Sequence, residues 1–248
     1  MKHLIKTLTV FFIWGYHSTG EEQTCRVPNA ITLKREVLKE GFHRDLITII
    51  EGNVTNSKSP LSFLLQENIP AGFYIDQYEL TNLEKFGGPK TIVPANIDVE
   101  KPAHLSQNFS ILVFSGPVHT NENHFSVTLK IPIHLRYQRS QSDRAHHMEV
   151  LPHPLLALRC DGLSLDAVDS GNYLTAPCNG NSELQQCYWK EAEYQISSPP
   201  PVMSVPVGQQ SHAQVVFLGT VFVMSAFTLL LIKTMVNSSK IKNKEKSR

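Results

Sequence analysis

The chain has 248 residues and a formal net charge of +1, but its charges are unevenly distributed. Residues 21–212 carry 15 lysines and arginines against 21 aspartates and glutamates, whereas residues 233–248 carry six basic residues and one acidic residue. The acidic balance of the long segment does not favour binding to nucleic acid, which needs a basic face. That segment is long enough to form one domain with its own hydrophobic core.

The first 20 residues have the pattern of a secretory signal peptide. Lys2 and Lys6 precede a short apolar run at residues 8–14, and small residues follow as far as Gly20. The apolar run is too short to span a membrane as a mature helix. We therefore predict that residues 1–20 are removed and that the chain enters the secretory pathway.

Alternating apolar and polar residues dominate the predicted domain, residues 21–196. In the clearest case, Phe125 to Leu135, every second residue is apolar, as in a strand with one buried and one wet face. Pro132 lacks an amide donor, so we expect this strand to be at a sheet edge or bulged there. Further strands are expected at residues 31–38, 45–50, 61–66, 109–114, 147–151, 155–160 and 188–196, and a short helix at residues 77–85. Many short strands without long alternating helices indicate a mainly β fold, an antiparallel β-sandwich.

The carboxyl-terminal part predicts a single membrane span. Eighteen residues without a charge, Val215 to Ile232, predict a transmembrane helix, which we place at residues 213–233. The Pro-rich residues 197–212 are interpreted as an extended stalk, with a partner contact near the bilayer as the alternative. The basic tail, residues 234–248, is expected in the cytosol, which places the sandwich on the other side of the lipid bilayer.

The four cysteines all lie in the predicted domain, at Cys25, Cys160, Cys178 and Cys187. An even number of cysteines behind a signal peptide predicts two disulfide bonds, for which three pairings are possible. We favour a local bond between Cys178 and Cys187, which would leave Cys25 to pair with Cys160.

Two kinds of short motif bear on modification and location. Asn53 and Asn108 stand in Asn-x-Ser/Thr sequons on the predicted non-cytosolic side, so both are expected to carry glycans. Asn237 stands in a third sequon, but on the cytosolic side, where we expect no modification. Lys244 and Lys246 match the KxKxx retrieval signal of endoplasmic-reticulum membrane proteins; a plain basic tail is the alternative.

The sequence predicts no catalytic, cofactor-binding or metal-binding residue. His146, His147 and His153 lie close together in the chain, but no second cluster at zinc-ligand spacing accompanies them. Residues 43–45, His-Arg-Asp, have no accompanying nucleophile motif such as GxSxG, and we interpret them as an ion pair at the entrance of a strand. The chain is therefore not expected to be an enzyme.

Two longer motifs point to a known family. Residues 37–46 (VLKEGFHRDL) and 69–80 (IPAGFYIDQYEL) closely resemble the PIG-X family, the class X proteins of glycosylphosphatidylinositol (GPI) anchor biosynthesis. Residues 133–137 (IHLRY), residues 176–178 (APC) followed by Cys187, and residues 205–208 (VPVG) are similar to later landmarks of the family.

The resemblance implies a single-pass type I protein of the endoplasmic reticulum that needs no cofactor. Members of the family bind and stabilise a polytopic mannosyltransferase, the class M protein, which adds the first mannose to the GPI precursor. That enzyme takes mannose from dolichol-phosphate mannose on the luminal side. The alternative is a type I cell-surface adhesion or receptor protein with an immunoglobulin-like sandwich, which residence at the plasma membrane would reveal.

Overall fold

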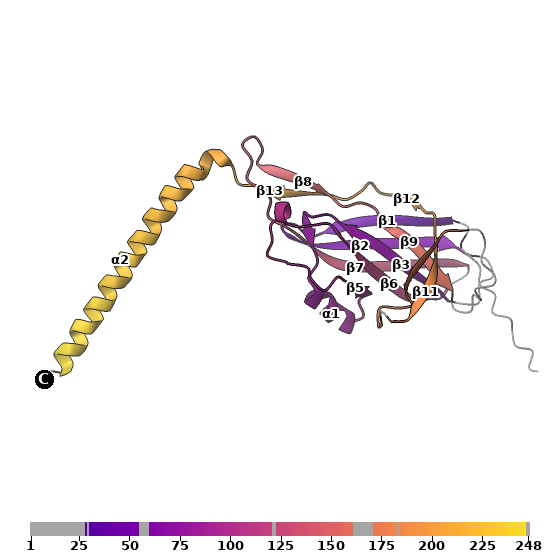
Figure 1. Ribbon diagram of the computed structural model, residues 1–248, viewed down its shortest axis with the longest axis horizontal. Helices are drawn as coiled ribbons and strands as arrows, with labels where there is room; N and C mark the ends of the chain where they lie inside the picture. Colours follow the sequence, from indigo (N-terminus) through magenta and orange to yellow (C-terminus); the bar gives the residue numbers. More distant parts are fainter. Residues whose placement is uncertain are drawn as a thin grey trace, which may run out of the picture.

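Two stacked β-sheets form the body of the computed structural model (Figure 1), as the alternating sequence predicted. The structure describes residues 28, 30–54, 60–120, 123–160, 171–182 and 184–246, with side chains as far as residue 238. The predicted signal peptide and Cys25 lie outside these residues. Of the short helices, α1 spans Gln77–Lys85, as predicted, and two 3-10 turns span Ala103–Leu105 (η1) and Gln210–His212 (η3).

The first sheet has five strands. Its order is β12 (Gln195–Ile196), β1 (Ala30–Leu38), β2 (His43–Asn53), β7 (His124–Leu135) and β4 (Phe73–Tyr74). All neighbours are antiparallel except β1 and β12. Pro132 of β7 pairs with Asp45 on one side, whereas β4 reaches only the last two residues of β7, His134 and Leu135. The proline therefore lies where β7 is an open edge, so its missing donor breaks no sheet hydrogen bond.

The second sheet has six strands. Its order is β10 (Tyr173–Pro177), β11 (Gln186–Glu191), β9 (Leu155–Cys160), β3 (Leu61–Ile69), β6 (Phe109–Val118) and β5 (Lys90–Ile92). The predicted strand at residues 188–196 is two strands in the structure. Its first part, in β11, pairs with β9 and β10, and its last part, β12, crosses to β1 of the other sheet.

The main hydrophobic core lies between the two sheets. The alternation in β7 buries Phe125, Leu129 and Ile133. The ring of Phe125 stacks on Phe63 of β3 with 5.1 Å between ring centroids, which joins the facing layers. A smaller cluster around Trp189 covers the outer side of the second sheet. Next to it, Cys178 and Cys187 form the predicted disulfide bond.

The segment expected to be a stalk differs from the prediction. Residues Val202–Pro206 form β13, which pairs with β8 (His146–Val150) in a two-stranded sheet. Met203 and Val205 of β13 are buried in the main core. Because alternate apolar residues bury one face of this segment, the packed domain extends beyond the predicted boundary at residue 196.

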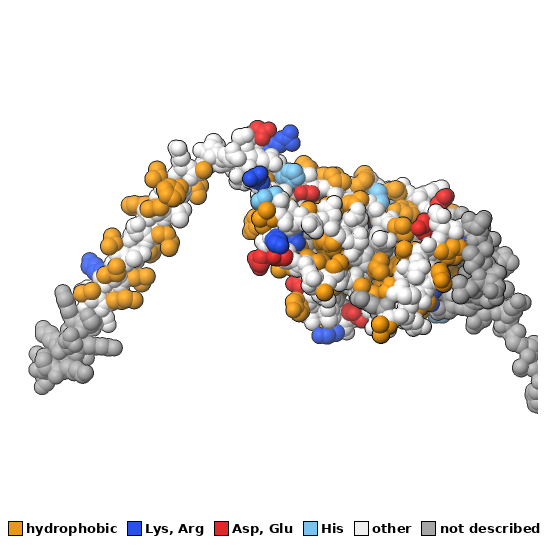
Figure 2. Space-filling model, in the orientation of Figure 1, with side chains coloured by type: hydrophobic (Ala, Val, Ile, Leu, Met, Phe, Trp, Pro, Cys, Tyr) orange, Lys and Arg blue, Asp and Glu red, His pale blue; other side chains and the backbone are white. Residues whose placement is uncertain are grey.

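The last helix, α2 (Ala213–Lys246), lies apart from the sheets (Figure 1). Together with the preceding turn η3, the first part of α2 makes up Gln210–Ser238, the one region of the described chain long and apolar enough to cross a membrane, judged by length and composition. Its hydrophobic side chains are exposed, as Figure 2 shows along the visible face. The helix continues past residue 233, where the predicted span ends, into the basic tail.

Candidate functional site

Three segments that are distant in the sequence meet at one end of the sandwich. They are the turn between β1 and β2, the β4–α1 segment, and the end of β7 (Figure 1). The amide of Leu135 donates to the carbonyl of Phe42 at 2.8 Å, and the amide of Arg136 donates to the carbonyl of Gly72 at 2.8 Å. These three segments contain the two stretches that most closely resemble the PIG-X family, residues 37–46 and 69–80, and one of the later similar landmarks, residues 133–137.

This end of the sandwich is the one nearest to α2 (Figure 1), and we call these three segments the α2-proximal end. Shortly after β7, Gln141 exchanges backbone hydrogen bonds with Gly208 and Gln210, just before α2 begins. Gly72 lies so close to Glu149 of β8 that any side chain there would overlap the Glu149 carboxyl group. The segments are therefore packed against the part of the chain that leads into the apolar helix.

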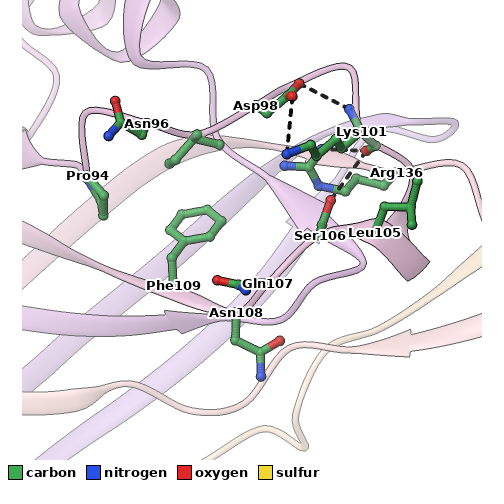
Figure 3. A pocket seen from close by; sticks show the side chains of 11 residues that line it. Pro94, Asn96, Asp98, Lys101, Leu105, Ser106, Gln107, Asn108, Phe109 and Arg136 are labelled. Carbon is green, nitrogen blue, oxygen red and sulfur yellow. Dashed lines mark hydrogen bonds and ion pairs between the residues drawn. The ribbon is translucent and has the colours of Figure 1, made fainter.

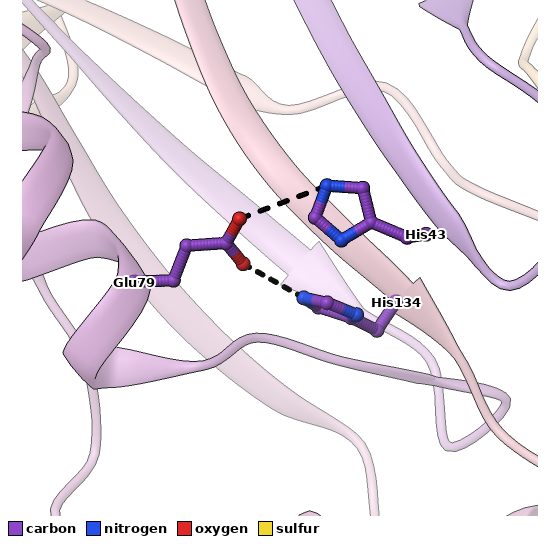
Figure 4. A group of neighbouring side chains, drawn as sticks. All are labelled: His43, Glu79 and His134. Atoms are coloured by element: carbon purple, nitrogen blue, oxygen red, sulfur yellow. Dashed lines mark hydrogen bonds and ion pairs between the residues drawn. The ribbon is translucent and has the colours of Figure 1, made fainter.

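A histidine pair and a glutamate form the centre of this end (Figure 4). His43 and His134 are directly opposite each other in the register of β2 and β7, on the outer face of the five-stranded sheet. Their rings contact edge-on with 4.6 Å between centroids. Glu79 of α1 reaches both: its Oε2 lies 2.9 Å from Nε2 of His134, and its Oε1 lies 3.6 Å from Nε2 of His43.

Local sequence explains why Glu79 is held there. Asp76 caps the start of α1 by accepting a hydrogen bond from the amide of Tyr78 at 2.8 Å. Leu80, the next residue of the helix, is buried in the core. The cap fixes where the helix begins and Leu80 fixes its rotation, so Glu79 faces the sheet.

Tyr74 and Arg136 support His134 from the other side. The Tyr74 ring stacks on His134 at 4.7 Å with an interplanar angle of 15°, and the Arg136 guanidinium lies over Tyr74 at 5.1 Å. Arg136 also donates to the carbonyls of Phe73 and Lys101, at 3.1 and 2.6 Å. The His134 ring is thus held in one orientation.

Asp45 of β2 lies beside this cluster and has its own partners. Lys130 and Lys39 reach its carboxylate at 2.9 and 3.0 Å. Burial of the Asp45 carboxyl opposes ionisation, but the hydrogen bonds from Lys130 and Lys39 outweigh it and lower its pKa below the ordinary value. Asp45 therefore forms an ion pair at this strand entrance, as predicted, but its close partners are Lys39 and Lys130, whereas Arg44 donates to the carbonyls of Gly41 and Lys39.

A shallow pocket of about 320 Å³ opens next to the cluster, between the loop before η1 and the start of β6 (Figure 3). Its walls combine polar groups, among them Asp98, Lys101 and Arg136, with the ring of Phe109. Asn108, one of the predicted glycosylation sites, also lines it. The polar groups of this pocket already have partners, since Lys101 lies 3.6 Å from Asp98 and Arg136 donates to the carbonyl of Lys101 at 2.6 Å.

Exposed apolar side chains surround the cluster. At this end Leu38, Tyr78, Leu105 and Tyr137 are all exposed to solvent. Tyr137 also contacts the ring of Phe42 at 4.9 Å between centroids. Aromatic side chains with a polar group are enriched where proteins bind other proteins.

Of the other predicted site residues, Asn108 lies beside this end, and the rest lie elsewhere in the domain or outside the described residues. Asn53 is exposed at the end of β2, and exposed Asn108 accepts a hydrogen bond from the amide of Ala71 at 2.8 Å. Cys160 is disulfide-bonded, but Cys25, its expected partner, is outside the described residues. The side chains of Lys244 and Lys246 are likewise outside them.

Sequence comparison gives the family. A family model described as PIG-X / PBN1 matches residues 39–236, which include the α2-proximal end and the apolar part of α2. The chain belongs to the PIG-X / PBN1 family. No solved structure matches it.

Two mammalian relatives share most of the length of this family member. The human protein named "GPI alpha-1,4-mannosyltransferase I, stabilizing subunit" is 30% identical over 206 residues, which cover 82% of this chain and 79% of the human protein. The rat protein of the same name is 28% identical over 218 residues, which cover 87% of this chain and 84% of the rat protein. The alignments therefore cover most of this chain and most of each relative.

The grouping of His43, Glu79 and His134 was not foreseen from the sequence. The sequence drew attention to His146, His147 and His153 because they are neighbours in the chain. His43 and His134 meet only because β2 and β7 are adjacent in this register. The one available signal was that both histidines, and Glu79, lie in stretches that resemble the same family.

Proposed function

We propose that this chain is a non-catalytic stabilising subunit of GPI mannosyltransferase I in the endoplasmic-reticulum membrane. Its partner would be the polytopic catalytic subunit, the class M protein, which transfers the first mannose from dolichol-phosphate mannose. The observation that carries this proposal is the similarity, over four-fifths of the chain, to a human protein named as the stabilizing subunit of that enzyme.

The architecture supports a binding role at a membrane. A lipid-borne donor and a lipid-borne acceptor need a catalytic site at the bilayer, built by an enzyme with several spans. This chain offers one apolar helix with exposed side chains and a sandwich that exposes two tyrosines, Tyr78 and Tyr137, at the end nearest that helix. We infer that α2 and the α2-proximal end contact the catalytic subunit together.

The proposed mechanism is stabilisation by mass action. A partner that binds the folded enzyme but not the unfolded one raises the apparent stability of the enzyme. Cells that lack this chain should therefore contain less catalytic subunit, display fewer GPI-anchored proteins and accumulate the precursor without mannose. Overproduction of the catalytic subunit should restore part of the display. If the catalytic subunit stays at its normal level while mannose transfer stops, the proposal is wrong.

A matched pair of tyrosine variants tests the contact surface. Tyr137, at the α2-proximal end, is 73% exposed, and Tyr188 of β11, towards the opposite end in Figure 1, is 55% exposed. We expect Tyr137→Ser to reduce co-purification of the catalytic subunit from gently solubilised membranes by several-fold, whereas Tyr188→Ser leaves it unchanged. Equal recovery with both variants would argue against a contact at this end.

The orientation in the membrane belongs to the same proposal. With the sandwich in the lumen, Asn53 and Asn108 receive glycans and Asn237 does not, which single Asn→Gln variants and a glycosidase mobility assay measure. A glycan on Asn237 would reverse the proposed orientation. If Lys244 and Lys246 act as a retrieval signal, changing both to Ser lets the two glycans become resistant to the endoglycosidase specific for high-mannose forms.

A further inference from the structure

We propose that His43, His134 and Glu79 form a zinc-binding site that joins β2, β7 and α1. The ligand atoms of the three side chains lie within 4.8 Å of one another. Zinc is held in proteins by imidazole nitrogens and carboxylate oxygens at about 2.0–2.2 Å in a tetrahedral arrangement, so its ligand atoms are about 3.3 Å apart. The Glu79 carboxylate contacts the two imidazoles through different oxygens: Oε2 lies 2.9 Å from Nε2 of His134, and Oε1 lies 3.6 Å from Nε2 of His43. A small movement of these side chains would bring the ligand atoms to the spacing of a zinc site.

The three ligands are held by separate parts of the fold. His134 is fixed by its stacking on Tyr74, and Glu79 is fixed by the capped and anchored helix α1. His43, opposite His134 in the sheet, is the most exposed of the three, and a small rotation of its ring would complete the set. Ligands that are already oriented lose little conformational freedom on binding.

Accessibility also suits a metal. The side chains of His43, Glu79 and His134 are 39%, 36% and 16% exposed, so an ion can enter from solvent and keep a water molecule as its fourth ligand. The nearby lysines, Lys39 and Lys130, pair with Asp45, so their positive charges are locally balanced. Two imidazoles and one carboxylate form a donor set typical of zinc rather than magnesium or calcium.

The site does not rest on the proposed function, because binding of zinc can be measured on the isolated full-length chain. The purified protein in detergent is stripped with a chelator, and Zn²⁺ is then titrated in competition with a chromophoric chelator. We expect one zinc ion per chain and a rise in the unfolding midpoint on zinc addition. Bound metal contributes free energy only to the folded state.

His43→Gln is the main variant, since the half-exposed ring can be replaced without opening the core. It should weaken zinc binding by more than about 100-fold, because even the loss of an outer-shell partner costs about 10–100-fold. Glu79→Gln should do the same. His147→Gln is the matched control: His147 is 37% exposed and lies 3.4 Å from Glu149, but outside any three-ligand group of the described residues. It should bind zinc like the unaltered chain.

Two results would overturn the site. One is the absence of stoichiometric zinc binding by the unaltered chain. The other is binding that persists in both His43→Gln and Glu79→Gln, or that falls equally in His147→Gln. In either case the three side chains are only a hydrogen-bonded link between α1 and the sheet.

Discussion

Two charged clusters occupy opposite kinds of environment in this domain. Arg35 of β1 and Glu67 of β3 face each other between the sheets, with side chains 0% and 1% exposed. Nη2 of Arg35 donates to both carboxylate oxygens of Glu67, at 2.9 and 3.0 Å. Nη1 of Arg35 donates to the carbonyl of Pro152 at 2.6 Å. The cluster of His43, Glu79 and His134 lies instead on an outer face, open to water.

This difference in burial indicates that the Arg35–Glu67 pair serves the structure, whereas the charged groups of the outer cluster are accessible to a ligand. The buried pair joins the two sheets, and its charges cannot be solvated if one partner is lost. The outer cluster joins a helix to a sheet edge, but water can replace each missing contact. Side chains whose contacts can be broken with little loss of folding free energy are free to contact a ligand instead. We therefore expect stability to depend on the first cluster and recognition on the second.

The largest effect is expected from Arg35→Met. It leaves the Glu67 carboxylate buried without its partner, which costs about 3–5 kcal/mol of unfolding free energy. Arg35→Met with Glu67→Leu should recover most of that loss, because no charge is left buried. Denaturant unfolding of the full-length chain, followed by the fluorescence of buried Trp189, measures both. A double variant as unstable as the single one would contradict the assignment.

The same single variant should show a defined pH dependence. Burial raises the pKa of Glu67, and Arg35 opposes that rise. Without Arg35 only burial remains, so the folded variant holds the proton more tightly than the unfolded chain does. The stability of Arg35→Met should therefore be greatest at low pH and fall as pH rises through the folded pKa of Glu67.

Asp45→Asn should have a smaller effect, about 1 kcal/mol or less, because Lys39 and Lys130 are half-exposed and screened by salt. The lowered pKa of Asp45 means that its stabilisation is present above the unfolded pKa, about 3.9, and is lost as pH falls through the folded pKa. Unfolding midpoints of the variant and the unaltered chain should converge in acid and in high salt. A difference that persists under both conditions would point to a cause other than this ion pair.

The smallest effect on stability is expected from His43→Gln in zinc-free buffer, within about 0.5 kcal/mol. The ring is partly exposed and its contacts to Glu79 and Asp45 are long, at 3.6 and 4.0 Å. Thermal unfolding with chelator present measures this. If His43→Gln costs as much as Arg35→Met, the outer cluster is part of the structural framework and the contrast between the two clusters fails.

The sequence by itself determined the features that depend on local pattern. The alternation of apolar and polar residues predicted β7, and the helix predicted at residues 77–85 is α1, Gln77–Lys85. The uncharged apolar run, residues 215–232, lies within α2. The Cys178–Cys187 bond followed from short spacing behind a signal peptide. Each of these is set by residues close together in the chain, where backbone period and loop length constrain the answer.

Only the tertiary structure decided which distant residues meet. The register of β2 against β7 puts His43 opposite His134, and the stacking of the sheets puts Arg35 opposite Glu67. The same holds for β13. It lies in the Pro-rich segment that the sequence predicted to be a stalk, and only the structure shows that it pairs with β8. Strand order and register arise from the packing of the whole core, and a one-residue shift would turn every one of these side chains to the other face.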